Sequence, residues 1–183
     1  MSNLTRFRTQ ILIKEAFIDL LKEIPFSSIT INHICEKAMI HRSTFYRYYD
    51  DKFELFHDAT NSIAIDLFKQ MQGFDLERTL FEEVIEYIDA NRALFLNITI
   101  KNNNHEIYDK LIQLGAEILL ENSKKNNDLL SNKIRSSKYP IVLCDFYCSG
   151  FVEIVKRWIN NDYPYSKEEL LYIAKNLQIN EPF

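Results

Sequence analysis

Glycine and proline are scarce in this chain of 183 residues, which has three glycines and four prolines. All-β sandwiches and barrels use these residues in their many turns, so the composition disfavours both classes. Gly73, Gly115 and Gly150 lie far apart in the sequence. A phosphate-binding loop or a dinucleotide fingerprint needs closely spaced glycines, so neither motif can be assembled here.

Cysteines and long apolar segments are also few. Cys35, Cys144 and Cys148 are an odd number in a long chain, so we expect buried thiols and no disulfide framework. The apolar runs are short, as at residues 141–144, and none approaches the roughly 18 residues of a membrane span. The first residues lack the apolar core of a signal peptide. We therefore expect a cytoplasmic protein with no membrane partner.

Positive charge is in deficit, because the formal net charge is −4. Taken alone, this balance argues against nucleic acid as a partner. The charge is nevertheless uneven: residues 1–55 carry a net +1 and residues 56–183 a net −5. This asymmetry indicates an N-terminal part and a C-terminal part with different partners.

Hydrophobic residues make up 46% of the chain and recur at helical spacing, and no long β-alternation competes with that pattern. The predicted fold class is all-α, and Ser166 with Glu169 forms a capping box for the last helix. The Asn-, Ser- and Lys-rich stretch 122–137 is expected to be a mobile loop or a frayed helix. The helices are expected at about 5–21, 31–38, 41–48, 52–71, 76–91, 92–100, 105–122, 140–160 and 166–178.

Residues 30–52 contain two short predicted helices joined by a tight turn, which is the pattern of a helix-turn-helix motif. Ile40, Phe45 and Tyr49 share one side of the second helix and are expected to point inward. The alternative is an ordinary helical hairpin with a solvated polar face. The side chains that fall on the opposite face, free to meet DNA, are Arg42, Ser43, Tyr46 and Arg47. Those with donors suited to phosphate are Tyr46, Tyr48 and Lys52.

Residues 29–38 (ITINHICEKA), 43–49 (STFYRYY) and 52–55 (KFEL) resemble the DNA-binding domain of TetR-family transcriptional regulators. The resemblance implies a helix-turn-helix domain at 1–51, whose second helix recognises operator DNA. It implies phosphate contacts for Thr30 and Lys52, each near the start of a helix. The complete set of DNA-binding residues that it implies is Thr30, His41, Arg42, Ser43, Thr44, Tyr46, Arg47, Tyr48 and Lys52.

Two positions depart from the family pattern. Met39 stands where the family usually has glycine, and a turn that needs a positive φ would be unfavourable for methionine. His41 stands where the family often has a small hydroxyl or amide cap, although histidine could itself contact DNA.

Residues 52–183 are expected to form a helical ligand-sensing and dimerisation domain. Residues 151–158 and 166–170 resemble the C-terminal region of the TetR subgroup that includes the activator of dihydroxyacetone kinase genes. The helix at 140–160 is apolar nearly all round, which predicts burial by its own domain on one side and by a second copy on the other. A core helix in a monomer is the alternative. The expected dimer residues are Cys148, Phe151, Val152, Val155, Ile159, Leu170, Ala174 and Leu177.

TetR-like domains of this kind commonly sense small molecules, and aromatic residues could line such a pocket, although plain core packing is the alternative. The aromatic candidates are Phe68, Phe81, Tyr87, Phe95, Tyr108, Phe146 and Tyr147.

Enzymatic and metal sites are poorly supported. Glu54 and His57 have a di-iron spacing but lack a second copy, and Cys144 with Cys148 lacks a second ligand pair. We expect no catalytic residues, no metal and no cofactor.

The expected function is that of a dimeric TetR-type regulator, which binds a palindromic operator and is most simply a repressor controlled by a small-molecule effector or a partner protein. An activator or coactivator with the same DNA-binding domain is the alternative, as is a helical protein-interaction module that does not bind DNA.

Overall fold

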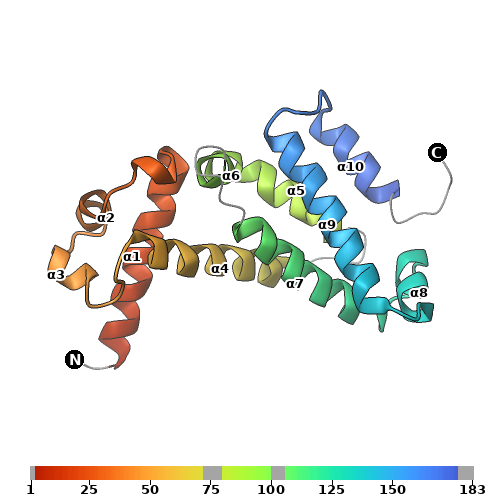
Figure 1. The fold of residues 1–183 in the computed structure, drawn as a ribbon, viewed down its shortest axis with the longest axis horizontal. Helices are drawn as coiled ribbons and strands as arrows, with labels where there is room; N and C mark the ends of the chain where they lie inside the picture. Colours follow the sequence, from red (N-terminus) through yellow and green to blue (C-terminus); the bar gives the residue numbers. More distant parts are fainter. Residues whose placement is uncertain (1–2, 72–79, 100–105, 177–183) are drawn as a thin grey trace. The chain divides into compact units, whose positions relative to one another are not determined.

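The computed structural model of the chain describes residues 3–71, 80–99 and 106–176. Within these residues the secondary structure is helical, with no strand, which confirms the predicted all-α class. A 3-10 turn at Phe26–Ser28 follows the first helix. The helices in chain order (Figure 1) are α1 (Asn3–Glu23), α2 (Ile31–Lys37), α3 (Arg42–Phe45), α4 (Lys52–Met71), α5 (Leu80–Ala90), α6 (Arg92–Thr99), α7 (Glu106–Ser123), α8 (Leu129–Ser136), α9 (Pro140–Ile159) and α10 (Lys167–Asn176).

The chain divides into two compact units, residues 1–63 with 91–106 and residues 64–90 with 107–183, which are called the head and the body below. The domain boundary expected at 51/52 falls at the start of α4, whereas the division between the units falls inside that helix. α6 belongs to the head because it packs along α1, where Nδ2 of Asn97 donates a hydrogen bond to the carbonyl oxygen of Leu21 at 2.9 Å.

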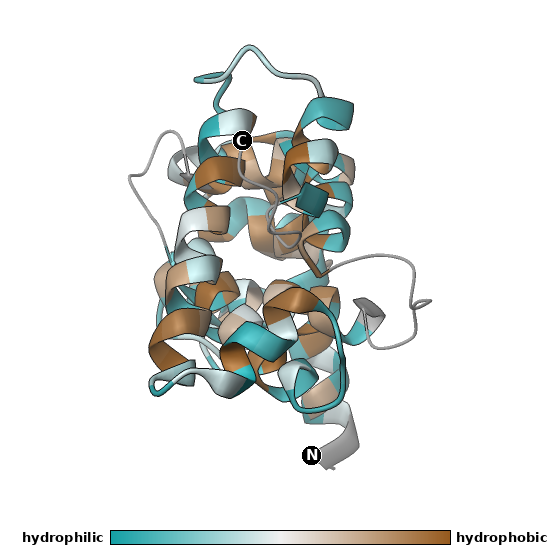
Figure 2. Ribbon diagram, turned by 90° about the vertical axis from the view of Figure 1, so that its right-hand side faces the viewer, coloured by the Kyte–Doolittle hydropathy of each residue, from teal (hydrophilic) through white to brown (hydrophobic). Residues whose placement is uncertain are grey.

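The head is built around aromatic rings from three segments. Phe17 of α1, Phe26 of the 3-10 turn and Phe56 of α4 are all buried. The ring centres of Phe26 and Phe56 lie 4.5 Å apart, and Phe17 packs edge-on against both rings. Along the helices apolar and polar residues alternate (Figure 2), as expected where each helix buries one side. This core fixes α4 against α1 and provides the support for α2 and α3.

The body has its own apolar core. Phe81 of α5 stacks on Phe151 of α9 with ring centres 4.3 Å apart. Gly115 of α7 allows close packing, because a Cβ at this position would lie 3.4 Å from Sγ of Cys148. The last helix begins with the predicted capping box, in which the backbone N–H of Ser166 donates to the carboxylate of Glu169, and the backbone N–H of Glu169 donates to the hydroxyl of Ser166.

Two elements differ from the sequence-based expectation. A formed helix, α8, lies inside the stretch expected to be a loop or a frayed helix. Oδ1 of Asp128 accepts from the backbone N–H of Ser131 at 2.8 Å, and Arg135 donates to the carbonyl oxygen of Ser123 at 2.9 Å, so both ends of α8 are tied down. α3 is shorter than expected, because the α-helix ends at Phe45 and the chain continues as turns to Tyr48.

Candidate nucleic-acid interface

The first helix of the motif, α2, is fixed at its start by a reciprocal cap. The hydroxyl of Thr30 accepts from the backbone N–H of His33 at 3.2 Å, and the backbone N–H of Thr30 donates to Nδ1 of His33 at 3.4 Å. Ile34 and Cys35 are buried, so α2 is held against the head by its apolar side. The cap occupies the hydroxyl of Thr30 as an acceptor and leaves its proton for another partner.

The turn that joins α2 to α3 has the geometry of a Schellman motif. The backbone N–H of Ile40 donates to the carbonyl oxygen of Cys35 at 2.9 Å, and that of Met39 donates to the carbonyl oxygen of Glu36 at 3.2 Å. Met39 has φ 52° and its side chain is 90% exposed. The turn therefore requires the left-handed conformation that glycine usually supplies, and methionine adopts it here at an energetic cost.

The second helix presents two different sides. Phe45 and Tyr49 are fully or almost fully buried and Ile40 is half-buried, as the spacing predicts. His41 is the N-cap of α3 but its side chain makes no capping hydrogen bond. The exposed side chains of this segment include the predicted group Arg42, Ser43, Tyr46 and Arg47.

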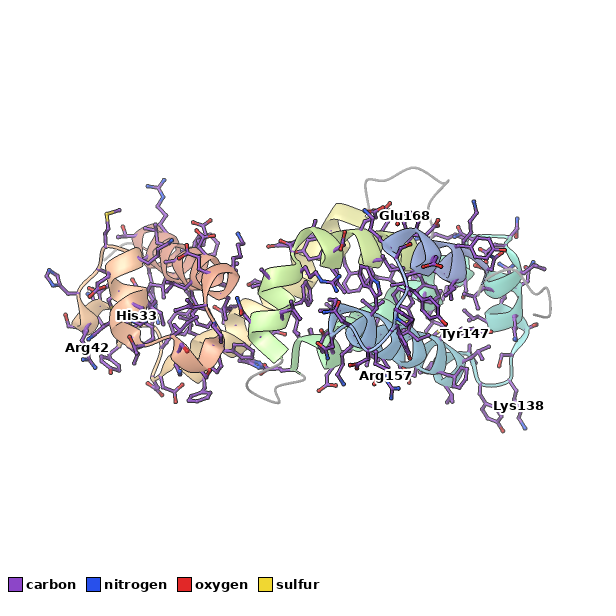
Figure 3. The ribbon with its side chains drawn as sticks, turned by 90° about the horizontal axis from the view of Figure 1, so that it is seen from above. His33, Arg42, Lys138, Tyr147, Arg157 and Glu168 are labelled. Atoms are coloured by element: carbon purple, nitrogen blue, oxygen red, sulfur yellow. The ribbon has the colours of Figure 1, made fainter. Side chains whose placement is uncertain are left out.

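The two arginines of this segment have neighbours on the same helical turn. Nη2 of Arg42 donates to the hydroxyl of Tyr46 at 3.1 Å, and Nη2 of Arg47 donates to the hydroxyl of Thr44 at 3.1 Å. Figure 3 shows Arg42 at the outer edge of the head. Arg42 also borders an open hollow of about 370 Å³, which is lined in addition by Asn32, Cys35, Glu36, Met39, Ile40 and His41. A guanidinium at the rim of an open hollow is accessible to an incoming nucleic acid.

The end of the recognition segment is anchored by a polar cluster inside the head. The Tyr49 hydroxyl donates to Oδ2 of Asp58 at 2.7 Å, while Nζ of Lys14 donates to Oδ1 of Asp58 at 2.9 Å and to the Ser62 hydroxyl at 2.8 Å. Asp58 and Lys14 were not among the sequence-predicted functional residues. The signal for them was weak, because they lie 44 positions apart and only the packing of α1 on α4 brings them together.

Lys52, predicted to contact phosphate, is engaged inside the head. Its ammonium donates to the carbonyl oxygens of Ile29 at 2.8 Å and Phe26 at 3.1 Å, and it lies 4.6 Å from the centre of the Phe26 ring. Partial burial lowers the pKa of Lys52 below its ordinary value. The residue therefore joins the start of α4 to the segment between α1 and α2. Of the other residues predicted to bind DNA, His41 is exposed and Tyr48 is half-buried.

The residues expected at a dimer interface lie in the core of the body of the single chain, and their contact with a second copy stays a prediction. Each of them that the structure describes is at most 6% exposed and packs within its own chain, and Leu177 lies outside the described residues. The exposed apolar side chains of α9 are Ile141, Val142 and Phe146, at 62%, 66% and 72%. The buried residues concerned are Cys148, Phe151, Val152, Val155, Ile159, Leu170 and Ala174.

The expected ligand-pocket residues are dispersed. Phe68 and Phe81 line a small apolar cavity in the body, whose volume of about 10 Å³ is at the lower limit for a single water molecule. Phe95 is fully buried in the head, and Phe146 is 72% exposed. The structure therefore does not bring these aromatics together around one cavity. The others lie in the body, with Tyr108 buried and Tyr87 and Tyr147 half-buried.

Glu54 and His57, which have the spacing of a di-iron site, form hydrogen bonds with other groups of the chain. A carboxylate oxygen of Glu54 accepts from the backbone N–H of Asp50 at 2.6 Å, and His57 contacts the carboxylate of Glu106. Among the described residues no three His, Cys, Asp or Glu side chains gather as metal ligands. None of the helices in 3–71, 80–99 and 106–176 combines the length and the hydropathy of a membrane span.

The chain is all-α, and its helix-turn-helix motif packs its apolar side inward and exposes its arginines. These features are those of a helix-turn-helix transcriptional regulator. Residues 78–180 match the TetR family model described as "Transcriptional regulator C-terminal region". The chain belongs to the TetR family of transcriptional regulators.

Two relatives of this chain are named as HTH-type transcriptional regulators. The chain is 24% identical over 170 residues to the uncharacterized HTH-type transcriptional regulator YxbF of Bacillus subtilis, in a match that covers 86% of this chain and 41% of YxbF. It is 25% identical over 122 residues to the HTH-type dhaKLM operon transcriptional activator DhaS of Lactococcus lactis, covering 65% of each. The chain thus spans less than two thirds of the length of the curated relatives that it matches.

Solved structures share the fold. The dihydroxyacetone kinase operon activator DhaS superposes with a TM-score of 0.59 at 20% identity, covering 93% of this chain and 94% of DhaS. The TetR family repressor AlkX from Dietzia superposes with a TM-score of 0.58 at 12% identity, covering 92% of each chain. At this level of identity the likeness establishes the architecture.

Proposed function

We propose that two copies of this chain bind a palindromic operator, with the α2–α3 motif of each head in the major groove. The observation that carries the proposal is the two-sided recognition segment: Phe45 is fully buried, while Arg42, Ser43 and Arg47 on the other side are exposed. Arginine donates two parallel hydrogen bonds to guanine, and serine or threonine bonds to bases or phosphates. The segment therefore offers base-specific and backbone contacts from one surface.

Further contacts would come from residues at the edges of this surface. His41 and Thr44 adjoin Arg42 and Ser43, and Thr30, which is exposed, and Tyr48, which is half-buried, would contact the phosphate backbone. We assign Lys52 a structural role, because its ammonium is bonded to backbone carbonyls within the head. Affinity would thus depend on a few arginines per head, doubled by dimerisation.

A second copy would pack on the exposed apolar side of α9. Three large apolar side chains stand out from the first half of that helix, and clusters of this kind commonly mark protein interfaces. The side chains are Ile141, Val142 and Phe146. Ser149 and Gly150 continue this exposed side of α9, and no heavy atom lies within 4 Å of a Cβ built at Gly150, so a second helix could approach closely there. A two-fold dimer through this side would present two heads to two half-sites.

Control would come from the body. A small-molecule effector or a protein partner that prefers one relative placement of the two heads would change operator occupancy. The apolar cavity beside Phe68 and Phe81 has a volume of only about 10 Å³, so an effector there would have to be apolar and would have to enlarge it. AlkX is named a repressor and DhaS an activator, and we propose repression here, in the cytoplasm where the operator lies.

The test is a gel shift with the DNA upstream of the chain's own gene, followed by the double variant Arg42→Ala/Arg47→Ala. We expect sequence-specific binding by the wild-type protein and at least a 100-fold loss of specific affinity in the variant. Circular dichroism serves as the control, because both side chains are exposed and the helical signal should not change. Absence of specific binding to any upstream or selected duplex at low salt would instead favour a protein-interaction module.

A further inference from the structure

Arg42 and Tyr46 form a pre-assembled pair on the exposed side of the recognition segment. Nη2 of Arg42 donates to the Tyr46 hydroxyl at 3.1 Å, and the guanidinium carbon lies 5.8 Å from the centre of the tyrosine ring. The two residues are four apart, the spacing at which side chains of a helical turn meet. Tyr46 therefore interacts with the Arg42 guanidinium through both its hydroxyl and its ring.

The Tyr46 ring packs in turn against a residue of the core, Phe45. The two rings stand edge-on, with centres 5.6 Å apart and planes at 90°. Phe45 is fully buried and the Tyr46 side chain is 47% exposed. Phe45, which is fixed in the core, therefore packs against Tyr46, and Tyr46 in turn orients Arg42.

This support matters because a free arginine side chain has many rotamers, and fixing it on DNA costs conformational entropy. A guanidinium has five N–H donors, and the bond to Tyr46 uses one. The others suffice for the two parallel hydrogen bonds that arginine makes to O6 and N7 of guanine. An arginine whose direction is set beforehand loses less freedom on binding and tolerates a wrong base less well.

We propose that Tyr46 is a positioning residue that orients Arg42 onto a guanine of each operator half-site, so that its hydroxyl contributes to base specificity through the arginine. The proposal rests on the operator binding proposed above and adds to it the base that Arg42 recognises. The alternative role is the phosphate contact expected for Tyr46 from the sequence, since a hydroxyl that accepts from Arg42 still carries a proton that it can donate.

The test separates these two roles. Duplexes selected from a random pool by the wild-type protein define the preferred half-site, and Kd is then measured for that duplex and for duplexes with single base-pair changes. The proteins compared are the wild type, Tyr46→Phe, Arg42→Ala, the double variant Tyr46→Phe/Arg42→Ala, and Tyr48→Phe as a control that removes a tyrosine hydroxyl from the same segment.

We expect a conserved guanine at which Arg42→Ala abolishes a discrimination of about 5- to 150-fold. Tyr46→Phe keeps the ring and should reduce the discrimination at that base pair by about 2- to 10-fold, the usual effect of one lost hydrogen bond. In the double variant the tyrosine change should add nothing, because Tyr46 acts through the arginine. Tyr48→Phe, which removes a proposed phosphate contact, should weaken all duplexes alike and leave the preference at that guanine unchanged.

The proposal is overturned if Tyr46→Phe weakens all duplexes equally and adds fully to Arg42→Ala, since that is the behaviour of a phosphate contact. It is also overturned if Tyr46→Phe changes nothing, or if the position lost in Arg42→Ala is not a guanine. Failure of the wild-type protein to select any sequence has a different meaning, because it removes the proposed operator binding itself.

Discussion

The Tyr49 hydroxyl donates a hydrogen bond to Oδ2 of Asp58 at 2.7 Å, which joins the end of the recognition segment to α4. Oδ1 of the same carboxylate accepts from Lys14 of α1 at 2.9 Å. Burial alone would raise the pKa of Asp58, but the hydrogen bonds from Tyr49 and Lys14 outweigh it and hold that pKa below its ordinary value. Burial, followed by the bond to the carboxylate, raises the pKa of Tyr49. One carboxylate therefore ties three parts of the head together.

Asp58→Asn should destabilise the head, because Lys14 and Tyr49 lose their charged acceptor. We expect a decrease of about 1–2 kcal/mol in the free energy of unfolding at pH 7, measured by urea denaturation. The folded pKa of Asp58 is lowered, so its stabilisation is present above the unfolded pKa of about 4 and is lost as the pH falls through the folded value. The difference between wild type and variant should therefore shrink below about pH 4.

A matched control for that variant is Asp66→Asn, because Asp66 lies on the same helix but is exposed and is 3.8 Å from its partner Lys69. Its effect should stay within about 0.5 kcal/mol. Equal destabilisation by the two variants, or a difference that does not depend on pH, would contradict the role assigned to Asp58.

Met39→Gly should stabilise the protein. The φ of 52° at Met39 is unfavourable for a residue with a Cβ, and the side chain is 90% exposed, so little packing is lost. We expect an increase of about 1 kcal/mol in the free energy of unfolding, measured by urea denaturation. Met39→Ala keeps the Cβ and should show no such gain, and a gain of equal size in the alanine variant would show that backbone strain is not the cause.

Lys52→Met should destabilise the head without reducing the salt dependence of DNA binding. The ammonium satisfies the carbonyl oxygens of Phe26 and Ile29, and leaving them without this donor should cost about 1–3 kcal/mol in the free energy of unfolding. A lysine that released counterions from DNA would change the log–log salt slope by about 0.9 per contact when removed. A slope reduced by that amount, with unchanged stability, would place Lys52 on the phosphate backbone.

Phe146→Glu should convert a dimer into monomers. The side chain is 72% exposed on α9 beside Ile141 and Val142, so a charge there would be desolvated in a two-fold interface. Light scattering should show half the mass, and operator affinity should fall by at least 10-fold. Phe7→Glu is the control, because Phe7 is similarly exposed, at 62%, but lies in the head. A Phe146→Glu protein that remains dimeric would exclude this side of α9.

Local rules were sufficient for much of the head. The φ of Met39 follows from the tight turn between two short helices, and the inward side of the recognition segment follows from the helical spacing of Phe45 and Tyr49. α8 was underestimated because polar residues dominate its composition, although Asp128 at its start is a recognisable cap. The polar cluster around Asp58 escaped prediction, since its members are distant in sequence.

By itself the sequence determined the all-α class, the helix-turn-helix motif and the outward direction of Arg42, because helical periodicity sorts polar from apolar side chains without knowledge of the partner helices. Only the tertiary structure decided how apolar residues of α9 divide between core and surface. Val152 and Phe146 are both apolar residues of a helix that is apolar nearly all round, so the sequence does not distinguish them. In the structure α5 and α7 cover one side of α9, which buries Val152 and leaves Phe146 exposed. In the head, tertiary packing places the ammonium of Lys52 against the carbonyl oxygens of Phe26 and Ile29, and no local pattern distinguishes that lysine from one that faces DNA.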